Sequence, residues 1–336
     1  MASTFRCLYV QEDASGNVSH GLADRPLDDL PIVDGPACQI DVRWTALNYK
    51  DALAATGHRG VIRSLPHIPG IDAVGTIASS DSAQFSVGDQ VIVTGYDLGT
   101  SRFGAWAEKI RVPVEWVVPL PEGLSQQEAI ILGTAGFTAA QCVAALLHNR
   151  VAVDEQPIVV TGATGGVAGL SIQILAKLGF HVVAVTGKQD EHDRLKSWGA
   201  SEVISRNDFT DTSGRPMLSA RFSGAIDTVG GSTLETVLRQ IAYRGCVAAC
   251  GLAGGHELHT TVYPFLLRGI TLAGIDSAMC PMSLRRDIWR KLAGDWKPQH
   301  LNEIAHQIRF DELPEAVASM LSGKHIGRSI VALESP

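Results

Sequence analysis

The sequence predicts an α/β protein with two domains, one built on a doubly wound parallel sheet and the other rich in short β-strands. Three observations support this fold class. Residues 158–188 follow a strand–turn–helix–strand pattern, and apolar runs alternate with helical stretches from there to about residue 275. The N-terminal third instead contains many short apolar runs separated by glycine and proline. At 336 residues the chain is long enough for two domains.

The strand–turn–helix–strand pattern begins with the apolar run Ile158–Val160, which is typical of a strand buried on both faces. Three glycines lie within 161–166, and helical periodicity follows from Val167 to the helix-ending Gly179. A second buried strand is expected over Val182–Val185. This βαβ unit is the expected start of a Rossmann-type sheet.

The glycine turn is where we expect a phosphate to bind. A helix N-terminus presents unpaired N–H groups and a partial positive charge, and glycines let the backbone approach a pyrophosphate closely. On the dinucleotide-binding fingerprint the three small positions are Ala163, Gly165 and Ala168, which departs from three strict glycines. The strand–turn–helix–strand context favours dinucleotide binding over an ordinary tight turn.

The end of the second strand indicates which cofactor binds. An NAD site usually has Asp or Glu there, whereas this sequence has Thr186-Gly187-Lys188 and its first acid is Asp190. A hydroxyl, a flexible glycine and a cation suit a 2′-phosphate, and Arg206 adds a second cation after the next apolar run. We therefore favour NADPH over NADH, the alternative being that both cations are solvated surface charges.

The βα alternation continues beyond this unit. Further helices are expected over 191–198, 234–242 and 264–268, and further strands over 203–204, 224–230, 246–250 and 270–275. Ligands should lie at the carboxyl ends of the strands, in the residues that follow Val160, Val185, Val229 and Cys250.

The N-terminal region is read as a compact β-rich domain with barrel character. Its strands are expected over 5–10, 39–45, 73–78, 90–94, 104–112 and 116–120. A short helix should open at 48–51 and end near Gly57. Its residues Asn48, Tyr49 and Asp51 are plausible as a pocket edge, although buried polar residues often only satisfy nearby backbone.

A long helix links the two regions. Ser125 and Glu128 form a capping-box pattern, and helical periodicity then runs over about 126–148 with a break near 133–136. From Met282 the pattern becomes an amphipathic helix, then strand, helix and strand up to residue 333. We therefore expect residues 1–127 to begin the β-rich domain, 128–283 to form the dinucleotide-binding domain, and 284–336 to return to the first domain.

Composition narrows the possible functions. The net charge of −7 does not favour nucleic-acid binding, and 45% hydrophobic with 19% charged residues is typical of a soluble globular protein. Six scattered cysteines without a CxxC pattern indicate reduced, mostly buried thiols in the cytoplasm. No signal peptide is apparent and no apolar run reaches membrane-spanning length.

Seven segments resemble the medium-chain dehydrogenase/reductase superfamily, and within it the acryloyl-CoA reductase branch of the quinone-oxidoreductase-like proteins. The segments are LNYKDALAATG (47–57), IPGIDAVGT (68–76), GTAGFTA (133–139), VVTGATGGV (159–167), AIDTVGG (225–231), GCVAACGLAGG (245–255) and PFLLRGITLAGIDS (264–277). The similarity spans almost the whole chain. It implies a GroES-like catalytic domain beside the Rossmann-type domain.

The resemblance also implies roles for individual residues. The pyrophosphate would lie on Thr164, Gly165, Gly166 and Val167, and the 2′-phosphate on Thr186, Gly187, Lys188 and Arg206. The nicotinamide half would be lined by Leu252, Leu266 and Ser277, and Tyr49 would reach the cofactor beside the reaction centre. Other members often have arginine where Lys188 stands, so one bidentate phosphate contact is missing here.

Zinc is not expected. Zinc-dependent members of the superfamily carry a Cys ligand after an early strand and a Gly-His-Glu further on, whereas this chain has Asn48-Tyr49 and Gly70-Ile71-Asp72 there. The four-cysteine lobe of a structural zinc is absent from the sequence, and His67 is a lone histidine that we expect at the surface or in a hydrogen bond. We therefore expect a metal-independent protein.

The activity implied by the resemblance is NADPH-dependent reduction of the activated C=C bond of acryloyl-CoA to propanoyl-CoA. Asn48, as an amide donor, and Tyr49, as a hydroxyl donor, are the candidates for positioning and proton supply, with water as another proton source. One alternative is a quinone or alkenal reductase of the same fold. The other is a non-catalytic NADPH-binding protein.

A homodimer is expected through the segment Gly269–Ile275. It is apolar and lies late in the predicted sheet, where an exposed edge strand would need to be covered. Pairing with the same strand of a second copy would satisfy both edges. The alternative is that a loop or the 284–292 helix covers this edge in a monomer.

Overall fold

The computed structural model describes residues 4–153 and 155–333, and the chain divides into two compact units. Unit 1 comprises Met1–Thr134, Ala278–Ala293 and Ala305–Pro336, and unit 2 comprises Ala135–Ser277 and Gly294–Ile304. Unit 1 extends past residue 127 because the carbonyl oxygens of Ile130 and Ile131 accept hydrogen bonds from Arg328, which belongs to the same unit.

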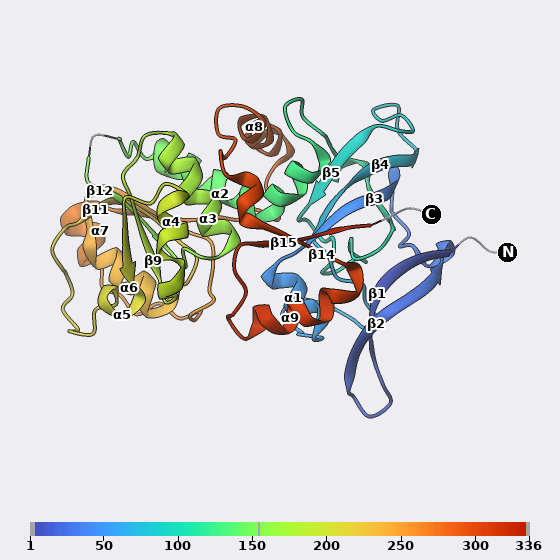
Figure 1. The fold of residues 1–336 in the computed structure, drawn as a ribbon, viewed down its shortest axis with the longest axis horizontal. Helices are drawn as coiled ribbons and strands as arrows, with labels where there is room; N and C mark the ends of the chain where they lie inside the picture. Colours follow the sequence, from blue (N-terminus) through green and yellow to red (C-terminus); the bar gives the residue numbers. More distant parts are fainter. Residues whose placement is uncertain (1–3, 154, 334–336) are drawn as a thin grey trace. The chain divides into compact units, whose positions relative to one another are not determined.

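Unit 2 is built on a six-stranded sheet in the order β10-β9-β8-β11-β12-β13, and every described pairing in it is parallel (Figure 1). The strands are β8 (Ile158–Thr161), β9 (Val182–Thr186), β10 (Glu202–Ser205), β11 (Phe222–Asp227), β12 (Ile241–Ala249) and β13 (Thr271–Gly274). The strand order changes direction between β8 and β11, which is the position where doubly wound sheets bind ligands. The predicted doubly wound sheet is confirmed, and β13 lies at its edge as expected.

The connections of unit 2 are helical. They are α3 (Gly166–Lys177), η3 (Gln189–Glu191), α4 (His192–Ser197), α5 (Arg206–Phe209), α6 (Gly231–Gln240), α7 (Tyr263–Arg268) and η4 (Leu301–Ile304). One core cluster joins Val159, Val183 and Val247 of the sheet to Val237 and Leu238 of α6. These side chains lose nearly all of their solvent exposure, which is the main source of stability for such a layer.

Unit 1 contains the β-rich domain. A seven-stranded sheet has the order β14-β15-β3-β4-β5-β7, with β6 also paired to β3, and β1 pairs with β2 in a separate hairpin. The bounds are β1 (Thr4–Glu12), β2 (Val18–Pro26), β3 (Ala37–Leu47), β4 (Asp72–Ser80), β5 (Gln90–Thr94), β6 (Lys109–Pro113), β7 (Val118–Pro119), β14 (Ala305–Ile308) and β15 (Arg328–Ala332). The helical elements are η1 (Leu27–Asp29), α1 (Tyr49–Ala55), η2 (Val114–Trp116), α8 (Met282–Ala293), η5 (Phe310–Glu312) and α9 (Leu313–Leu321).

Strand β2 was not expected from the sequence. Its nine residues, VSHGLADRP, include none that is fully buried, so they lack the apolar alternation that indicates a strand. Pairing with β1 forms the strand instead, in a register that places Leu8 opposite Leu22.

The strand expected over 104–112 is shorter than predicted, because only Lys109–Pro113 belongs to β6. The backbone N–H groups of Gly104, Ala105 and Trp106 donate to the carbonyl oxygens of Ile68, Gly70 and Pro69, so this stretch forms a loop packed against residues 68–70.

Helix α2 (Gln126–His148) confirms two predictions. Ser125 and Glu128 cap it reciprocally: the Glu128 N–H donates to Ser125 Oγ at 3.1 Å, and the Ser125 N–H donates to Glu128 Oε2 at 2.9 Å. The expected break occurs at Gly133, where φ is 47° and ψ is −151°. A Cβ at this position would lie 2.5 Å from Asp72 Oδ2 and 2.7 Å from Arg328 Nη2, so both the backbone and the space require glycine.

The expectation that no apolar run reaches membrane-spanning length was wrong for α2. This helix is long and apolar enough to cross a membrane, but 78% of its apolar window is buried inside the protein. Such burial is what the core helix of a globular domain shows.

Candidate active site

A buried polar network lies in unit 1 where β3 leads into α1. Asn48 caps α1, and its side chain is joined to Asp51, Asp72 and Arg328 by hydrogen bonds. Thr134 completes the group by donating its N–H to Asp72 at 3.0 Å. We call these five residues the Asp72 network.

The Asn48 side chain has no N–H left for a substrate. Its Nδ2 donates to Asp51 Oδ2 at 3.0 Å and to Asp72 Oδ2 at 2.9 Å, while its Oδ1 accepts from Arg328 Nη1 at 2.7 Å. An amide carries two N–H donors, and both are used here. The expected role of Asn48 as an amide donor to the substrate therefore does not fit this arrangement, and Asn48 is better described as a positioning residue.

Two carboxyl groups of the network are completely buried. Asp51 and Asp72 are both 0% exposed and share the Asn48 amide. Burial, followed by the nearby charge of Asp72, raises the pKa of Asp51 to about 7, although hydrogen bonds from Asn48 and Ile71 favour the ionised form. The protein therefore favours a state in which only one of these two carboxyl groups is ionised.

Arg328 supplies the opposite charge. It lies on β15, is 2% exposed, and places Nη2 3.4 Å from Asp72 Oδ2 and Nε 3.0 Å from the carbonyl oxygen of Ile131. A buried cation without such partners would be very costly. The sequence does not indicate either partner of Asp72, because Arg328 lies 256 residues from it and Thr134 lies 62 residues from it, so no local pattern connects them.

Tyr49 directly follows this network and is 44% exposed at the first position of α1. Its hydroxyl forms no hydrogen bond within the described ranges, so it is accessible to a ligand. An exposed hydroxyl that is held by a rigid, buried network is suited to orienting a small molecule.

The positions where zinc ligands would stand carry no metal-binding cluster among the described residues. Ile71 is 4% exposed and packs in the core. His67, which we expected at the surface or in a hydrogen bond, is 3% exposed, and burial lowers its pKa while a hydrogen bond with the Gly99 backbone opposes this. Its backbone pairs with Val10 in an isolated bridge, so it is a structural part of unit 1.

The glycine turn of unit 2 lies between β8 and α3, as predicted. The Gly165 N–H donates to the carbonyl oxygen of Gly162 at 2.9 Å, and Gly162 has a φ of 64°. A Cβ at Gly165 would meet only that carbonyl oxygen, at 3.3 Å. Gly165, Gly166 and Val167 are all partly exposed, so a ligand can approach the backbone at the start of α3, and Thr164 is 7% exposed beside them. Val167 lies in the first turn of α3, with Gly166 as the first helical residue.

The neighbouring strand ends are tied together beneath this turn. Thr161 Oγ1 donates to Asp227 Oδ1 at 2.7 Å, and Asp227 Oδ2 accepts from the Gly230 N–H at 2.8 Å. Asp227 is fully buried, and this burial raises its pKa. The link fixes the end of β11 against the end of β8, where the cofactor is expected.

The structure brings together the four residues predicted to bind a 2′-phosphate. Arg206 begins α5 and lies across Gly187, since a Cβ on that glycine would be 3.4 Å from Arg206 Cζ. The Lys188 N–H donates to Thr186 Oγ1 at 3.1 Å. Burial lowers the pKa of Lys188, as does the charge of Arg206, whereas Glu191 raises it. Two cations close enough for their charges to interact favour the binding of an anion near them.

The three residues predicted to line the nicotinamide half lie at separate places in unit 2. Leu252 follows β12 and is 59% exposed, Leu266 lies on α7 and is 75% exposed, and Ser277 follows β13. Leu252 and Leu266 are thus both accessible to a ligand.

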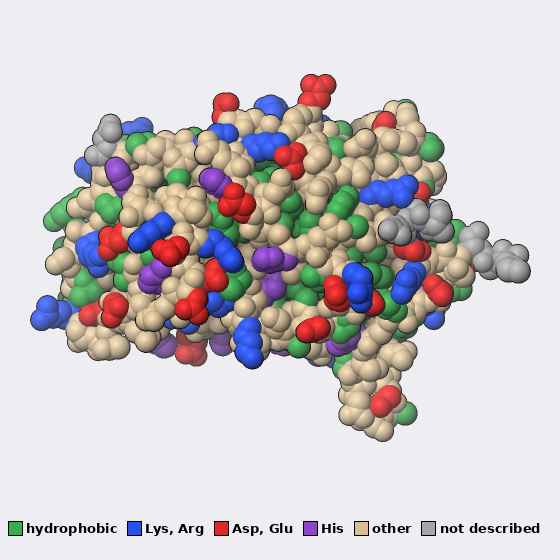
Figure 2. Space-filling view, viewed as in Figure 1, with side chains coloured by type: hydrophobic (Ala, Val, Ile, Leu, Met, Phe, Trp, Pro, Cys, Tyr) green, Lys and Arg blue, Asp and Glu red, His purple; other side chains and the backbone are tan. Residues whose placement is uncertain are grey.

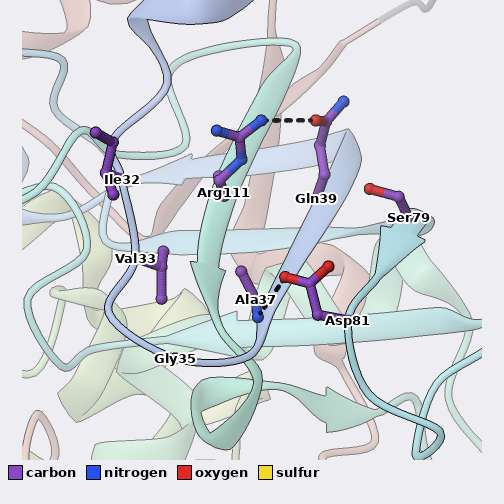
Figure 3. Close-up of a pocket in the computed structure, with 8 residues that line it drawn as sticks. All are labelled: Ile32, Val33, Gly35, Ala37, Gln39, Ser79, Asp81 and Arg111. Atoms are coloured by element: carbon purple, nitrogen blue, oxygen red, sulfur yellow. Dashed lines mark hydrogen bonds between the residues drawn. The ribbon is translucent and has the colours of Figure 1, made fainter.

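A cavity of about 290 Å³ lies elsewhere in unit 1 (Figure 3). In it Arg111 donates to Gln39 at 3.4 Å, and the Ala37 N–H donates to Asp81 at 3.2 Å. Its lining contains none of the predicted site residues, and two of its polar side chains, Arg111 and Gln39, are bonded to each other. We therefore place no ligand there.

Two family models match the chain. Residues 36–122 match the alcohol dehydrogenase GroES-like domain, and residues 166–293 match the zinc-binding dehydrogenase family. The two matched regions lie in the β-rich part of unit 1 and mainly in unit 2, respectively.

Individual relatives cover nearly the whole chain. The probable acrylyl-CoA reductase AcuI of Escherichia coli is 44% identical over 91% of this chain and 93% of its own. The yhdH oxidoreductase of Salmonella enterica, solved in complex with NADP, is 41% identical with a TM-score of 0.94, covering 98% of this chain and 100% of its own. The yhfP protein of Bacillus subtilis, solved with NAD bound, is 43% identical with a TM-score of 0.94, covering 99% and 100%.

Proposed function

The chain belongs to the medium-chain dehydrogenase/reductase superfamily, in its quinone-oxidoreductase-like branch, and we propose that it reduces the activated C=C bond of acryloyl-CoA to propanoyl-CoA with NADPH. It is an NADP-dependent oxidoreductase. The observation that carries the substrate proposal is the 44% identity over 91% of this chain to a protein named as a probable acrylyl-CoA reductase. The Asp72 network and exposed Tyr49 support it from the side of chemistry.

The residues present fit NADPH. The start of α3 is open at Gly165, and the end of β9 has two cations, Lys188 and Arg206, where an NAD site usually has an acid. When bound, the cofactor supplies the hydride. The chain's own residues have to hold the pyrophosphate at 164–167 and the 2′-phosphate between Lys188 and Arg206.

The Asp72 network acts on the reaction by positioning. Asn48 and Asp51 fix the first turn of α1, and Arg328 holds Asp72 beneath it. This leaves Tyr49 as the exposed hydroxyl that orients the thioester and donates a hydrogen bond to the oxyanion formed on its carbonyl oxygen. The α-carbon takes its proton from Tyr49 or from water.

The test is turnover of acryloyl-CoA by purified protein with NADPH, followed at the nicotinamide absorbance. We expect Tyr49→Phe to lower kcat with little change in the KM for NADPH, because only the hydroxyl is removed. A matched control is Tyr243→Phe, which alters an equally simple phenol that is 73% exposed in unit 2. Turnover of small quinones or alkenals with a higher kcat/KM than acryloyl-CoA would contradict the substrate. Binding of NADPH without turnover of any of these would indicate a non-catalytic protein.

We also propose a cytoplasmic homodimer formed through β13. This strand ends the sheet of unit 2, and nearby α7 exposes Leu266 and Leu267 by 75% and 60%. Uncovered strand edges and apolar patches of this kind favour association. We expect wild-type protein to sediment as a dimer at micromolar concentration and Leu272→Lys to sediment as a folded monomer. A monomeric wild type contradicts this proposal.

A further inference from the structure

Three exposed cations follow the candidate reaction centre along the chain. Lys50 is next to Tyr49 on α1, and Arg59 and Arg63 lie in the segment after that helix. Within residues 4–153 and 155–333, Lys50 and Arg63 form no hydrogen bond or ion pair, and Arg59 pairs with Glu12 at 2.9 Å.

The segment that carries these cations contains a single acid, and the acid that pairs with Arg59, Glu12, comes from β1. Between residues 48 and 66 the only acid is Asp51, which is 0% exposed and belongs to the Asp72 network. This differs from the rest of the molecule, whose net charge is −7 and whose visible face mixes acidic and basic side chains (Figure 2). The segment thus contributes more cations than acids to an acidic protein.

The backbone of this segment is fixed at both ends. Asn48 and Asp51 hold its start, and the His67 N–H donates to the Val10 carbonyl oxygen at 2.8 Å near its end. Between them, the Ile62 N–H donates to the carbonyl oxygen of His58 at 3.1 Å, and Ile62 is 1% exposed. This buried anchor places Arg59 and Arg63 on either side of one ordered turn.

We propose that Arg59 and Arg63 bind the phosphates at the nucleotide end of the acyl-CoA substrate. This inference rests on the proposed function, because it assumes a CoA thioester. The pantetheine arm separates the reacting thioester from the pyrophosphate and the 3′-phosphate, so these phosphates must bind away from Tyr49. Helix α1 has seven residues and is therefore about 10 Å long, and Arg59 and Arg63 follow its far end, whereas Tyr49 stands at its start.

A second basic surface of unit 1 serves as the matched control. Arg286 and Arg290 of α8 line a cavity of about 570 Å³ together with Phe85 and Trp289. Arg290 is paired with Asp287 at 2.9 Å, just as Arg59 is paired with Glu12 at 2.9 Å, so each pair of arginines includes one that already has an acidic partner. This surface lies on α8, outside the segment that carries Tyr49.

The experiment compares two thioesters in the full-length protein with saturating NADPH. One is acryloyl-CoA, and the other is acryloyl-N-acetylcysteamine, which has the same reacting group without the nucleotide. In the Arg59→Ala/Arg63→Ala variant we expect the KM for acryloyl-CoA to rise roughly three- to tenfold at low ionic strength, with the rise shrinking in high salt. The KM for the truncated thioester should stay unchanged, and Arg286→Ala/Arg290→Ala should leave both constants as in the wild type.

Other outcomes distinguish a failure of this inference from a failure of the proposed function. If the wild type prefers acryloyl-CoA over the truncated thioester but Arg59→Ala/Arg63→Ala does not weaken that preference, the inference is wrong while the proposed function stands. The same holds if the α8 variant produces the larger change. If the wild type reduces neither thioester, the proposed function fails and the inference with it. Competitive inhibition by adenosine 3′,5′-bisphosphate against acryloyl-CoA, weakened in the variant, supports the assignment by a second route.

Discussion

The glycine turn of unit 2 and the Asp72 network of unit 1 are both expected to serve one reaction, but they are built in opposite ways. The turn uses backbone groups from a few consecutive residues and keeps them open by omitting side chains, as at Gly165. The network uses charged side chains from distant parts of the chain and keeps them fully buried, as at Asp72 and Arg328. The first design depends on space for a ligand, whereas the second depends on every partner being present.

The largest expected effect is the loss of Arg328. Arg328→Met keeps most of the side-chain volume but leaves Asp72 with an uncompensated buried charge, so unit 1 should lose about 3–5 kcal/mol of unfolding free energy. Urea denaturation measures this. Arg309→Met is the matched control, because Arg309 is exposed and its removal should change stability little. Equal effects of the two substitutions would show that the network does not depend on its cation.

The second largest effect is expected at the predicted 2′-phosphate site of unit 2. Lys188→Ala/Arg206→Ala should raise the KM for NADPH on the order of 100-fold, because two charge-assisted phosphate contacts are lost. The KM for NADH should change little, since NADH has no 2′-phosphate. Steady-state kinetics with both cofactors measures this, with Lys196→Ala on α4 as a surface control. A parallel rise for NADH and NADPH contradicts the assignment of these cations.

A smaller effect depends on pH. Because burial raises the pKa of Asp51 to about 7, the folded protein keeps a proton that the unfolded chain releases from about pH 4 upward. Wild-type stability should therefore fall as pH rises from 5 to 8, and Asp51→Asn should gain on the order of 2 kcal/mol relative to the wild type over that range. Denaturation curves at several pH values measure this, with Asp295→Asn as a control. A constant difference across the range would mean that Asp51 is ionised throughout.

The smallest expected effect is that of chelation. Ile71 and Asn48 stand where zinc ligands would be, so prolonged treatment with a chelator should leave the reduction rate unchanged. Loss of activity that added zinc restores would overturn the metal-independent interpretation.

The contrast between the two regions also explains how far the sequence was informative. The βαβ unit, the capped and kinked α2 and the alternation of strands and helices along unit 2 follow from local periodicity, turn residues and glycine positions. The Asp72 network could not be predicted in this way. The local sequence indicates a polar pocket edge at Asn48 and Asp51. Their partners Asp72 and Arg328 are brought to them only by tertiary folding.

Strand β2 illustrates the same limit in a simpler case. It forms because β1 offers a pairing edge, with Leu8 opposite Leu22, and not because its own residues alternate between apolar and polar. Pairing and burial at long range override local preference in β-structure.

The position of β15 determines when unit 1 can finish folding during translation. In the sheet of unit 1 this strand, Arg328–Ala332, lies between β14 and β3, and it also delivers the guanidinium that neutralises Asp72. A ribosome makes β3 and Asp72 long before residue 328, at about 5–20 residues per second. During that interval residues 44–47 of β3 lack the strand that pairs with them, and the carboxylate has no cation. The nascent first domain therefore stays incomplete while the second is translated, and it closes only as the last strand emerges.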